Sequence, residues 1–247
     1  MQPREHYKDI GYKPFLFYVI FGVTGDDMHP SQSRHHVDCL PEGLELHALS
    51  RPGHSDYMDG FFSGDLGIVL KESSMDLYKK CLAAENCIII KGHIEEDSNL
   101  DYMRNVIGII QALMDEGAVG VLDFQTFSLY SPEIWKDLFF EKEVNAQNHV
   151  VILYSEETDG YWLHTRGMAE FGRPDCSMSG VPYDQVEECQ QIINQMIYYS
   201  GEGVFFSGEF RLHTFSGNTY KVTSHFVDDF DNNDFNNAYC EVEAELV

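Results

Sequence analysis

Residues 87–124 read CIIIKGHIEEDSNLDYMRNVIGIIQALMDEGAVGVLDF, and they show the clearest secondary-structure pattern in the chain. The segment opens with the short apolar run 87–90, which is typical of a buried strand. Five apolar residues then recur at three- and four-residue spacing: Leu100, Met103, Ile107, Ile110 and Met114. This spacing predicts an amphipathic helix that ends at Gly117, and residues 119–124 predict another buried strand. Strand, helix and strand in this order indicate a fold that mixes both elements.

The same reasoning extends outward to the rest of the chain. Further helices are expected over residues 74–84, 131–139 and 184–197, because a capping side chain opens each of them. Further strands are expected at residues 15–21, 44–49, 67–70, 150–154, 161–165, 205–215, 220–227 and 238–247, the last as an edge strand. The sequence therefore predicts an α+β fold with mixed sheets and about four helices.

Two organisations of the 247 residues are open. No Ser-, Gly- or Pro-rich linker divides the chain, which favours a single α+β unit over residues 1–247. If the chain has a domain boundary, residues 124–131 are the best candidate for it. The alternative is therefore two α/β halves, 1–124 and 131–247, that pack together.

Charge is the strongest constraint on function. Sixteen Lys and Arg stand against 41 Asp and Glu, a formal net charge of −25. Nucleic-acid binding depends on Lys and Arg that neutralise phosphates, so we expect no nucleic-acid partner. Anionic membrane surfaces are disfavoured for the same reason, and no apolar run approaches the length of a membrane helix. A basic protein partner, a bound divalent metal and no partner at all remain open.

Cysteine usage indicates the compartment. The six cysteines are scattered, without a C-x-x-C pair: Cys39, Cys81, Cys87, Cys176, Cys189 and Cys240. Free buried thiols in a reducing environment fit this spacing, whereas a disulfide framework is the alternative. The first residues lack a charged-then-apolar leader pattern, so a cytoplasmic protein is expected.

Acidic residues are enriched towards the end of the chain. Residues 181–247 hold 12 Asp and Glu against Arg211 and Lys221 alone. The partner-binding residues that we expect from this enrichment are Asp228, Asp229, Asp231, Asp234, Glu241 and Glu243. An EF-hand loop starting at Asp229 would need Gly and Glu at its sixth and twelfth positions, but Asp234 and Cys240 stand there. An exposed acidic turn, a patch for a cationic partner and an adventitious site for a hard cation remain.

The segment 164–175, HTRGMAEFGRPD, departs from generic patterning. Its charged and titratable residues are His164, Arg166, Glu170, Arg173 and Asp175. Arginine makes forked hydrogen bonds to carboxylates, so one hypothesis is a structural clamp that holds a loop. The other hypotheses are an anion or substrate site, with His164 as acid or base, and a protein-contact loop.

This segment also carries a resemblance. Thr165-Arg166-Gly167-Met168, followed by Phe171-Gly172-Arg173-Pro174-Asp175, resembles the signature T-x-G-[ML]-x-x-F-G-x-P-[DE] of an uncharacterised bacterial family. The similarity extends over about residues 118–200. The family implies no established activity, so the resemblance gives a relationship without a mechanism.

A third group of residues has the chemistry of metal ligands. His29, His35, His36 and Asp38 follow Asp26 and Asp27 within one polar loop. Imidazole and carboxylate bind zinc, iron or manganese, but this spacing matches no established ligand pattern, and loops collect such residues anyway. These residues therefore form either a solvated loop or a metal site. No catalytic residue and no cofactor are indicated, since the chain lacks G-x-S-x-G and a cysteine in a basic setting.

Three functions follow from these observations. The first is a non-enzymatic acidic cytoplasmic binding protein, resembling an immunity protein or antitoxin that neutralises a cationic bacterial toxin. The second is a metal-assisted hydrolase that uses the loop 29–38 or His164. The third is a scaffold protein whose charge serves solubility alone.

Overall fold

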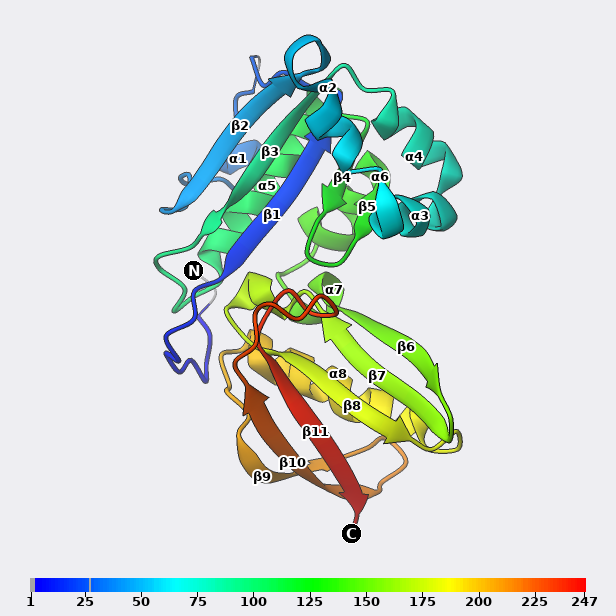
Figure 1. The fold of residues 1–247 in the computed structure, drawn as a ribbon. Coiled ribbons are helices and arrows are strands. Elements are labelled where there is room, and N and C mark those ends of the chain that lie inside the picture. Colours follow the sequence, from blue (N-terminus) through cyan, green and yellow to red (C-terminus); the bar gives the residue numbers. More distant parts are fainter. Residues whose placement is uncertain (1–2, 27) are drawn as a thin grey trace. The chain divides into compact units, whose positions relative to one another are not determined.

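The computed structural model describes residues 3–26 and 28–247, and these form two compact units. Unit 1 contains residues 15–144, and unit 2 contains residues 3–14 and 145–247. From residue 3 onward, the chain thus passes through unit 2, builds unit 1 and returns to complete unit 2 (Figure 1). The domain boundary expected at residues 124–131 lies inside unit 1, and the boundary between the units falls at residues 144–145.

Unit 1 is built on an antiparallel five-stranded sheet of order β2-β3-β1-β4-β5. Its strands are β1 (Phe15–Phe21), β2 (Leu44–Ser50), β3 (Asn86–His93), β4 (Gly120–Asp123) and β5 (Ser128–Tyr130). The central strand β1 alternates its side chains between two cores. Phe21 packs with Met58 and Leu70 on one face, whereas Tyr18 contacts the ring of the buried Trp135 on the other.

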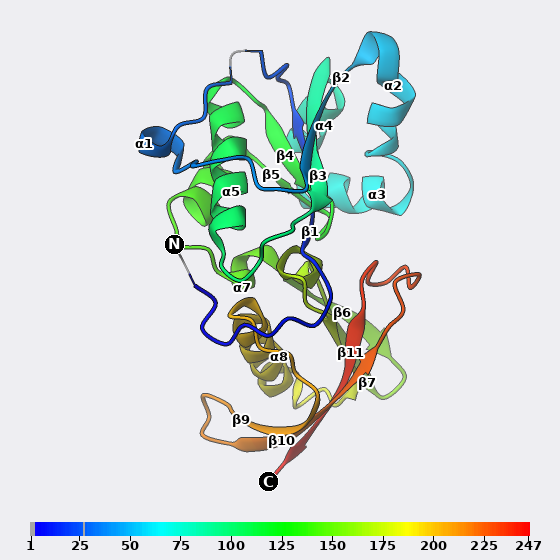
Figure 2. The ribbon, with the colours of Figure 1, turned by 90° about the vertical axis from the view of Figure 1, so that its left-hand side faces the viewer.

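Helices cover both faces of this sheet (Figure 2). They are α1 (Gln32–His35), α2 (Arg51–Gly60), α3 (Gly64–Ser73), α4 (Met75–Leu82), α5 (Asp101–Asp115) and α6 (Pro132–Trp135), with a π-helical turn at Lys136–Phe140. The helix α5 packs on one face, and α2, α3 and α4 supply the apolar side chains on the other. The later part of the loop 24–42 lies along α5, where Asn105 Oδ1 accepts hydrogen bonds from the amides of Asp38 (2.7 Å) and Cys39 (3.3 Å).

Unit 2 is built on a six-stranded sheet of order β6-β7-β8-β11-β10-β9. Its elements are α7 (Ala146–His149), β6 (Val151–Glu157), β7 (Gly160–Arg166), a 3-10 turn (Met168–Phe171), β8 (Asp175–Val181), α8 (Val186–Gly201), β9 (Gly208–His213), β10 (Thr219–Val227) and β11 (Tyr239–Leu246). The pair β8–β11 is parallel, and the other neighbours are antiparallel. The helix α8 covers one face of this sheet (Figures 1 and 2).

The predicted α+β class is confirmed, with two differences of detail. The described residues form eight α-helices rather than about four. Residues 67–70, expected as a strand, lie within α3, where Gly67 and Leu70 are buried and the two residues between them are exposed. Burial at three-residue spacing is the helical pattern, which a four-residue apolar run is too short to reveal.

The strand at the end of the chain is the second difference. Residues 238–247 were expected at an edge, but β11 lies between β8 and β10. Its alternation of buried Cys240 and Val242 with exposed Glu241 and Glu243 gives a strand with one covered face. The parallel pairing of β11 with β8 joins residues more than 60 positions apart, so no local pattern indicates it.

Gly108 on α5 provides a test of the packing in unit 1. A Cβ atom there would lie 2.0 Å from the carbonyl oxygen of His35, so Gly108→Ala forces the loop 24–42 away from the helix. We expect a loss of about 1–3 kcal/mol in the free energy of unfolding, measured by urea denaturation. Gly60→Ala, where a Cβ meets nothing within 4 Å, should be neutral or stabilising by up to about 1 kcal/mol. Equal effects of the two substitutions would contradict this packing.

Candidate functional site

A buried carboxylate organises the end of the unit 2 sheet. Asp175, at the start of β8, is completely buried. Its Oδ1 atom accepts a hydrogen bond from Thr165 Oγ1 (2.7 Å) on β7, and its Oδ2 atom accepts one from Asn237 Nδ2 (2.8 Å). The Asn237 amide also donates to the carbonyl oxygen of Arg173 (2.9 Å). Asp175 therefore joins two strands to the segment that leads into β11.

Burial raises the pKa of Asp175 from 3.8 to about 6. Desolvation is the largest cause, and the hydrogen bonds from Asn237 and Thr165, together with the nearby charge of Arg166, oppose it. A carboxylate in this setting depends on its donors, because removal of any donor leaves buried charge without compensation.

Two glycines allow the chain to form the 3-10 turn within segment 164–175. Gly167 (φ 118°) and Gly172 (φ 60°) flank the 3-10 turn in the left-handed region that favours glycine. A Cβ atom at Gly172 would also lie 2.9 Å from the carbonyl oxygen of Tyr12, which belongs to the N-terminal segment of unit 2. The turn is thus shaped to receive that segment.

Arg166 connects this turn to the loop that carries four of the expected partner-binding residues. Its side chain is buried, and Nη1 donates to the carbonyl oxygens of Asn233 (3.3 Å) and Asp234 (2.9 Å). A guanidinium below the loop fixes its backbone while the loop's own carboxylates remain exposed.

Arg173 has a different role, which it shares with Arg4. Arg173 donates to the carbonyl oxygens of Gly172, Gly203, Val204 and Lys8, and Arg4 donates to those of Ser200, Gly201 and Phe171. Both guanidinium groups also lie over the ring of Tyr7, at 5.6 Å and 5.5 Å from its centroid. Several of these carbonyls terminate α8, where positive charge is favourable.

The remaining carboxylate of the segment pairs with a histidine. Glu170 Oε2 lies 3.0 Å from His149 Nδ1, and both side chains are buried. The structure thus uses the charged residues of segment 164–175 to join β7, β8, α7, α8 and the N-terminal residues of unit 2. These contacts are those of a structural clamp, built largely on carbonyl oxygens.

His164 lies two residues before Arg166 on β7, opposite in face to Thr165, and is surrounded by aromatic rings. Its ring stacks on Trp162 with centroids 3.9 Å apart and meets the edge of Phe235 at 5.6 Å. Burial lowers the pKa of His164, although the charge of Asp234 acts in the opposite direction. The side chain is 6% exposed, and its Nδ1 atom has no hydrogen-bond partner among the described residues.

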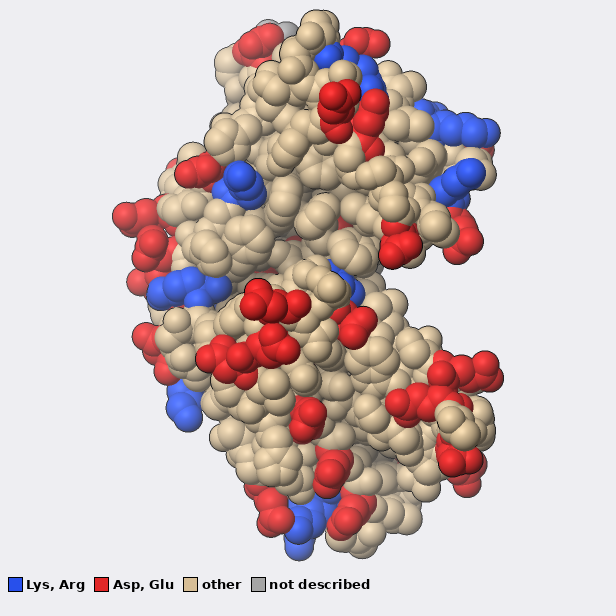
Figure 3. Space-filling view, in the orientation of Figure 1, with Lys and Arg blue, Asp and Glu red and all other residues tan. Residues whose placement is uncertain are grey.

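The expected partner-binding residues lie together on unit 2. We call them the acidic surface: Asp228, Asp229, Asp231, Asp234, Glu241 and Glu243. All six are exposed; the four aspartates lie in the loop between β10 and β11, and the two glutamates lie on β11. Because α8 covers the opposite face of the sheet, the glutamates face solvent. Figure 3 shows this row of carboxylates along β11 and its preceding loop.

The acidic loop has internal order. The amide of Asp231 donates to Asp229 Oδ1 (3.2 Å), and the amide of Asp234 donates to Asn232 Oδ1 (2.9 Å). Phe230, 49% exposed, lies between these turns with its ring 5.4 Å from that of Tyr12. A hydrogen bond to Asp228 contributes to a raised pKa of Tyr12, after burial of the hydroxyl. The acidic surface therefore has a fixed frame with one half-exposed aromatic ring.

The proposed metal ligands of unit 1 have separate surroundings. His35 is buried, with Nδ1 accepting from the amide of Ser31 (3.2 Å) and Nε2 lying 3.2 Å from Asp115. His36 stacks near Phe140, while His29 and Asp38 are exposed. Asp27 lies outside the described residues, and across the described part of the chain no three His, Cys, Asp or Glu side chains are placed to hold a metal ion together.

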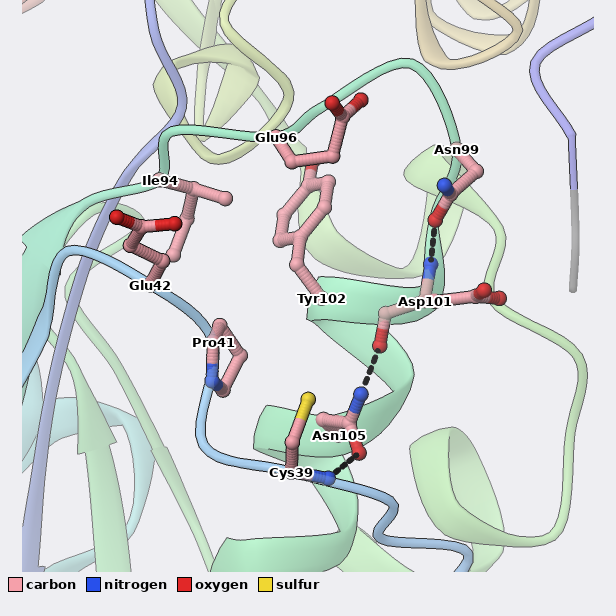
Figure 4. Close-up of a pocket in the computed structure, with 9 residues that line it drawn as sticks. All are labelled: Cys39, Pro41, Glu42, Ile94, Glu96, Asn99, Asp101, Tyr102 and Asn105. Atoms are coloured by element: carbon pink, nitrogen blue, oxygen red, sulfur yellow. Dashed lines mark hydrogen bonds between the residues drawn. The ribbon is translucent and has the colours of Figure 1, made fainter.

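A pocket of about 180 Å³ lies beside this loop (Figure 4). Residues of the loop, the segment between β3 and α5 and the first turns of α5 line it, including Cys39, Glu42, Glu96, Tyr102 and Asn105. Asn105 Nδ2 donates to the carbonyl oxygen of Asp101, and Glu96 accepts hydrogen bonds from Ser98. Several lining side chains are thus engaged in local structure.

Comparison with known proteins adds no relative. The chain matches no protein-family model, no curated protein and no solved structure. The similarity of residues 165–175 to a bacterial signature stays a prediction. Within the described residues, the helices are too short or too polar to cross a membrane.

Sequence reasoning missed several residues of this site. Arg4, Tyr7 and Tyr12 belong to unit 2 although unit 1 separates them from it in the sequence. Asn237, the partner of Asp175, stands in an asparagine-rich loop where one amide is not distinguishable from its neighbours. Trp162 offered the clearest signal, because it is one of only two tryptophans and alternates with buried Leu163 in a predicted strand.

The raised pKa of Asp175 predicts a specific pH dependence. Its folded-state pKa exceeds the unfolded value of 3.8, so its contribution to stability is greatest below pH 4 and is lost as pH rises to about 6. We expect the wild-type protein to lose about 2–3 kcal/mol relative to Asp175→Asn between pH 4 and pH 7 in urea titrations. A difference between the two proteins that stays constant over this range would contradict the burial of the charge.

Proposed function

We propose that this chain is a non-enzymatic binding protein whose acidic surface binds a basic protein. The observation that carries the proposal is the arrangement of six exposed carboxylates along β11 and its preceding loop. Arg166 binds two backbone carbonyls of this loop and Asp175 binds its Asn237 side chain, so the backbone that carries the four aspartates is held in place. A preorganised charged surface loses less conformational entropy on binding than a flexible acidic tail does.

The overall charge of −25 supports the same proposal. A strongly negative molecule attracts cationic proteins over distances of about 10 Å at moderate ionic strength and accelerates their association. Fast association matters most to a protein that must neutralise a harmful enzyme, so we propose an immunity or antitoxin-like role against a cationic bacterial toxin. All six cysteines are free thiols in the structure, which supports placing the protein in the cytoplasm.

A pair of double variants tests this proposal. Asp229→Asn with Asp231→Asn removes two charges from the acidic surface and keeps the side-chain oxygen that accepts the Asp231 amide. Against a panel of purified basic toxin domains, we expect association about 3–10-fold slower than for the wild type in biolayer interferometry at low salt. We expect this difference to shrink as salt is raised.

The matched control is Glu156→Gln with Asp159→Asn, which removes two exposed charges at the β6–β7 hairpin. This control should bind as the wild type does, within a factor of about two. Equal losses in both double variants, or binding that ignores salt, would contradict recognition by the acidic surface. A protein that binds no member of the panel would favour the solubility role instead.

A further inference from the structure

One aromatic side chain lies beside the acidic surface on the solvent face of the unit 2 sheet. Trp162 on β7 is partly exposed, and its indole Nε1 donates to Ser177 Oγ (2.9 Å) on β8. This hydrogen bond directs the ring across the sheet towards β11. The imidazole of His164 stacks on one face of the indole at 3.9 Å.

The sheet register places a carboxylate one strand away from the serine that holds this ring. Ser177 pairs with His164 on one side and with Glu241 on the other, and Glu241 pairs in turn with His225 on β10. Residues paired in register project from the same face, and neighbouring strands lie about 4.8 Å apart. The exposed carboxylate of Glu241 is thus one strand away from the serine that holds the indole.

We propose that Trp162 and Glu241 form a subsite for one arginine side chain of the basic protein partner. This inference rests on the proposed function and specifies the contact that the acidic surface makes. A guanidinium lies flat on an aromatic ring and at the same time forms forked hydrogen bonds to a carboxylate. Lysine offers a point charge, which fits such a planar arrangement less well.

The surroundings favour a cation at this position. The buried His164 has a lowered pKa, so the ring that stacks on the indole is neutral at pH 7 and does not repel a guanidinium. Glu243 and Asp234 add negative charge near the subsite, on β11 and in the acidic loop. The nearby cation, Arg166, is buried and already donates to the backbone of that loop. Aromatic residues next to complementary charge are the usual centres of binding energy in interfaces.

The chain's two tryptophans make a direct test possible. Trp135 is completely buried in unit 1 and donates to the carbonyl oxygen of Ile107, so Trp135→Phe leaves Trp162 as the only indole emitter. The probes are a hexa-arginine peptide and a hexa-lysine peptide, titrated at low salt with a dye label for affinity. We expect the arginine peptide to bind and to change the Trp162 emission saturably, with a smaller change for the lysine peptide.

Two single-charge variants in this background separate the subsite from general attraction. Glu241→Gln should weaken binding of the arginine peptide about three- to tenfold. Glu187→Gln removes one exposed charge from α8, on the covered side of the sheet, and should change affinity less than twofold. Both positions are exposed, so neither substitution threatens the fold.

The outcomes distinguish failure of the Trp162–Glu241 subsite from failure of the proposed binding function. Binding with unchanged Trp162 emission, or equal effects of Glu241→Gln and Glu187→Gln, would overturn the subsite and leave the proposed function intact. Identical affinity and emission changes for the two peptides would overturn the assignment to arginine. Binding by neither peptide, together with no binding in the toxin panel, would overturn the proposed function and the subsite with it.

Discussion

The burial of one carboxylate constrains most of unit 2. Asp175 has no access to water, so its charge has to be stabilised by hydrogen bonds from Thr165, Asn237 and the amide of Met168. These donors come from β7, from the segment that enters β11 and from the 3-10 turn. The Asn237 donor reaches Asp175 because β11 lies beside β8, so the parallel strand pairing supplies one of the three hydrogen bonds to the buried charge.

This constraint also determines where the acidic residues are presented. With β11 held between β8 and β10, the loop 228–238 must cross the end of the sheet, where Arg166 binds its backbone from below. Along β11 itself, the alternation of strand side chains buries Cys240 and Val242 and exposes Glu241 and Glu243. A chain that is acidic throughout thereby gains one surface whose carboxylates project from a held backbone, and the covered face of the same sheet carries the apolar core.

Local patterns in the sequence predicted what depends on local physics. The apolar run of β1, the helical spacing in α5 and the cap at Ser131, whose Oγ accepts the amide of Ile134 at 3.3 Å, were all visible in the sequence. Contacts between distant residues were not. The strand β8 was hidden because it lacks a run of apolar residues, and the clamp at Arg173 uses carbonyl oxygens, which every residue carries. His35 resembled a metal ligand in sequence but is a buried partner of Asp115.

Hydrogen exchange in the acidic loop tests most directly whether the buried network fixes the acidic surface. The amides of Phe235 and Asn236 donate to the carbonyl oxygen of Asn232, at 3.2 Å and 2.8 Å, and their protection reports the order of the loop. In Arg166→Gln we expect these amides to exchange at least about tenfold faster than in the wild type, while amides of α5 in unit 1 keep their protection. Unchanged exchange in the loop of this variant would contradict the claim that the clamp holds the acidic surface in place.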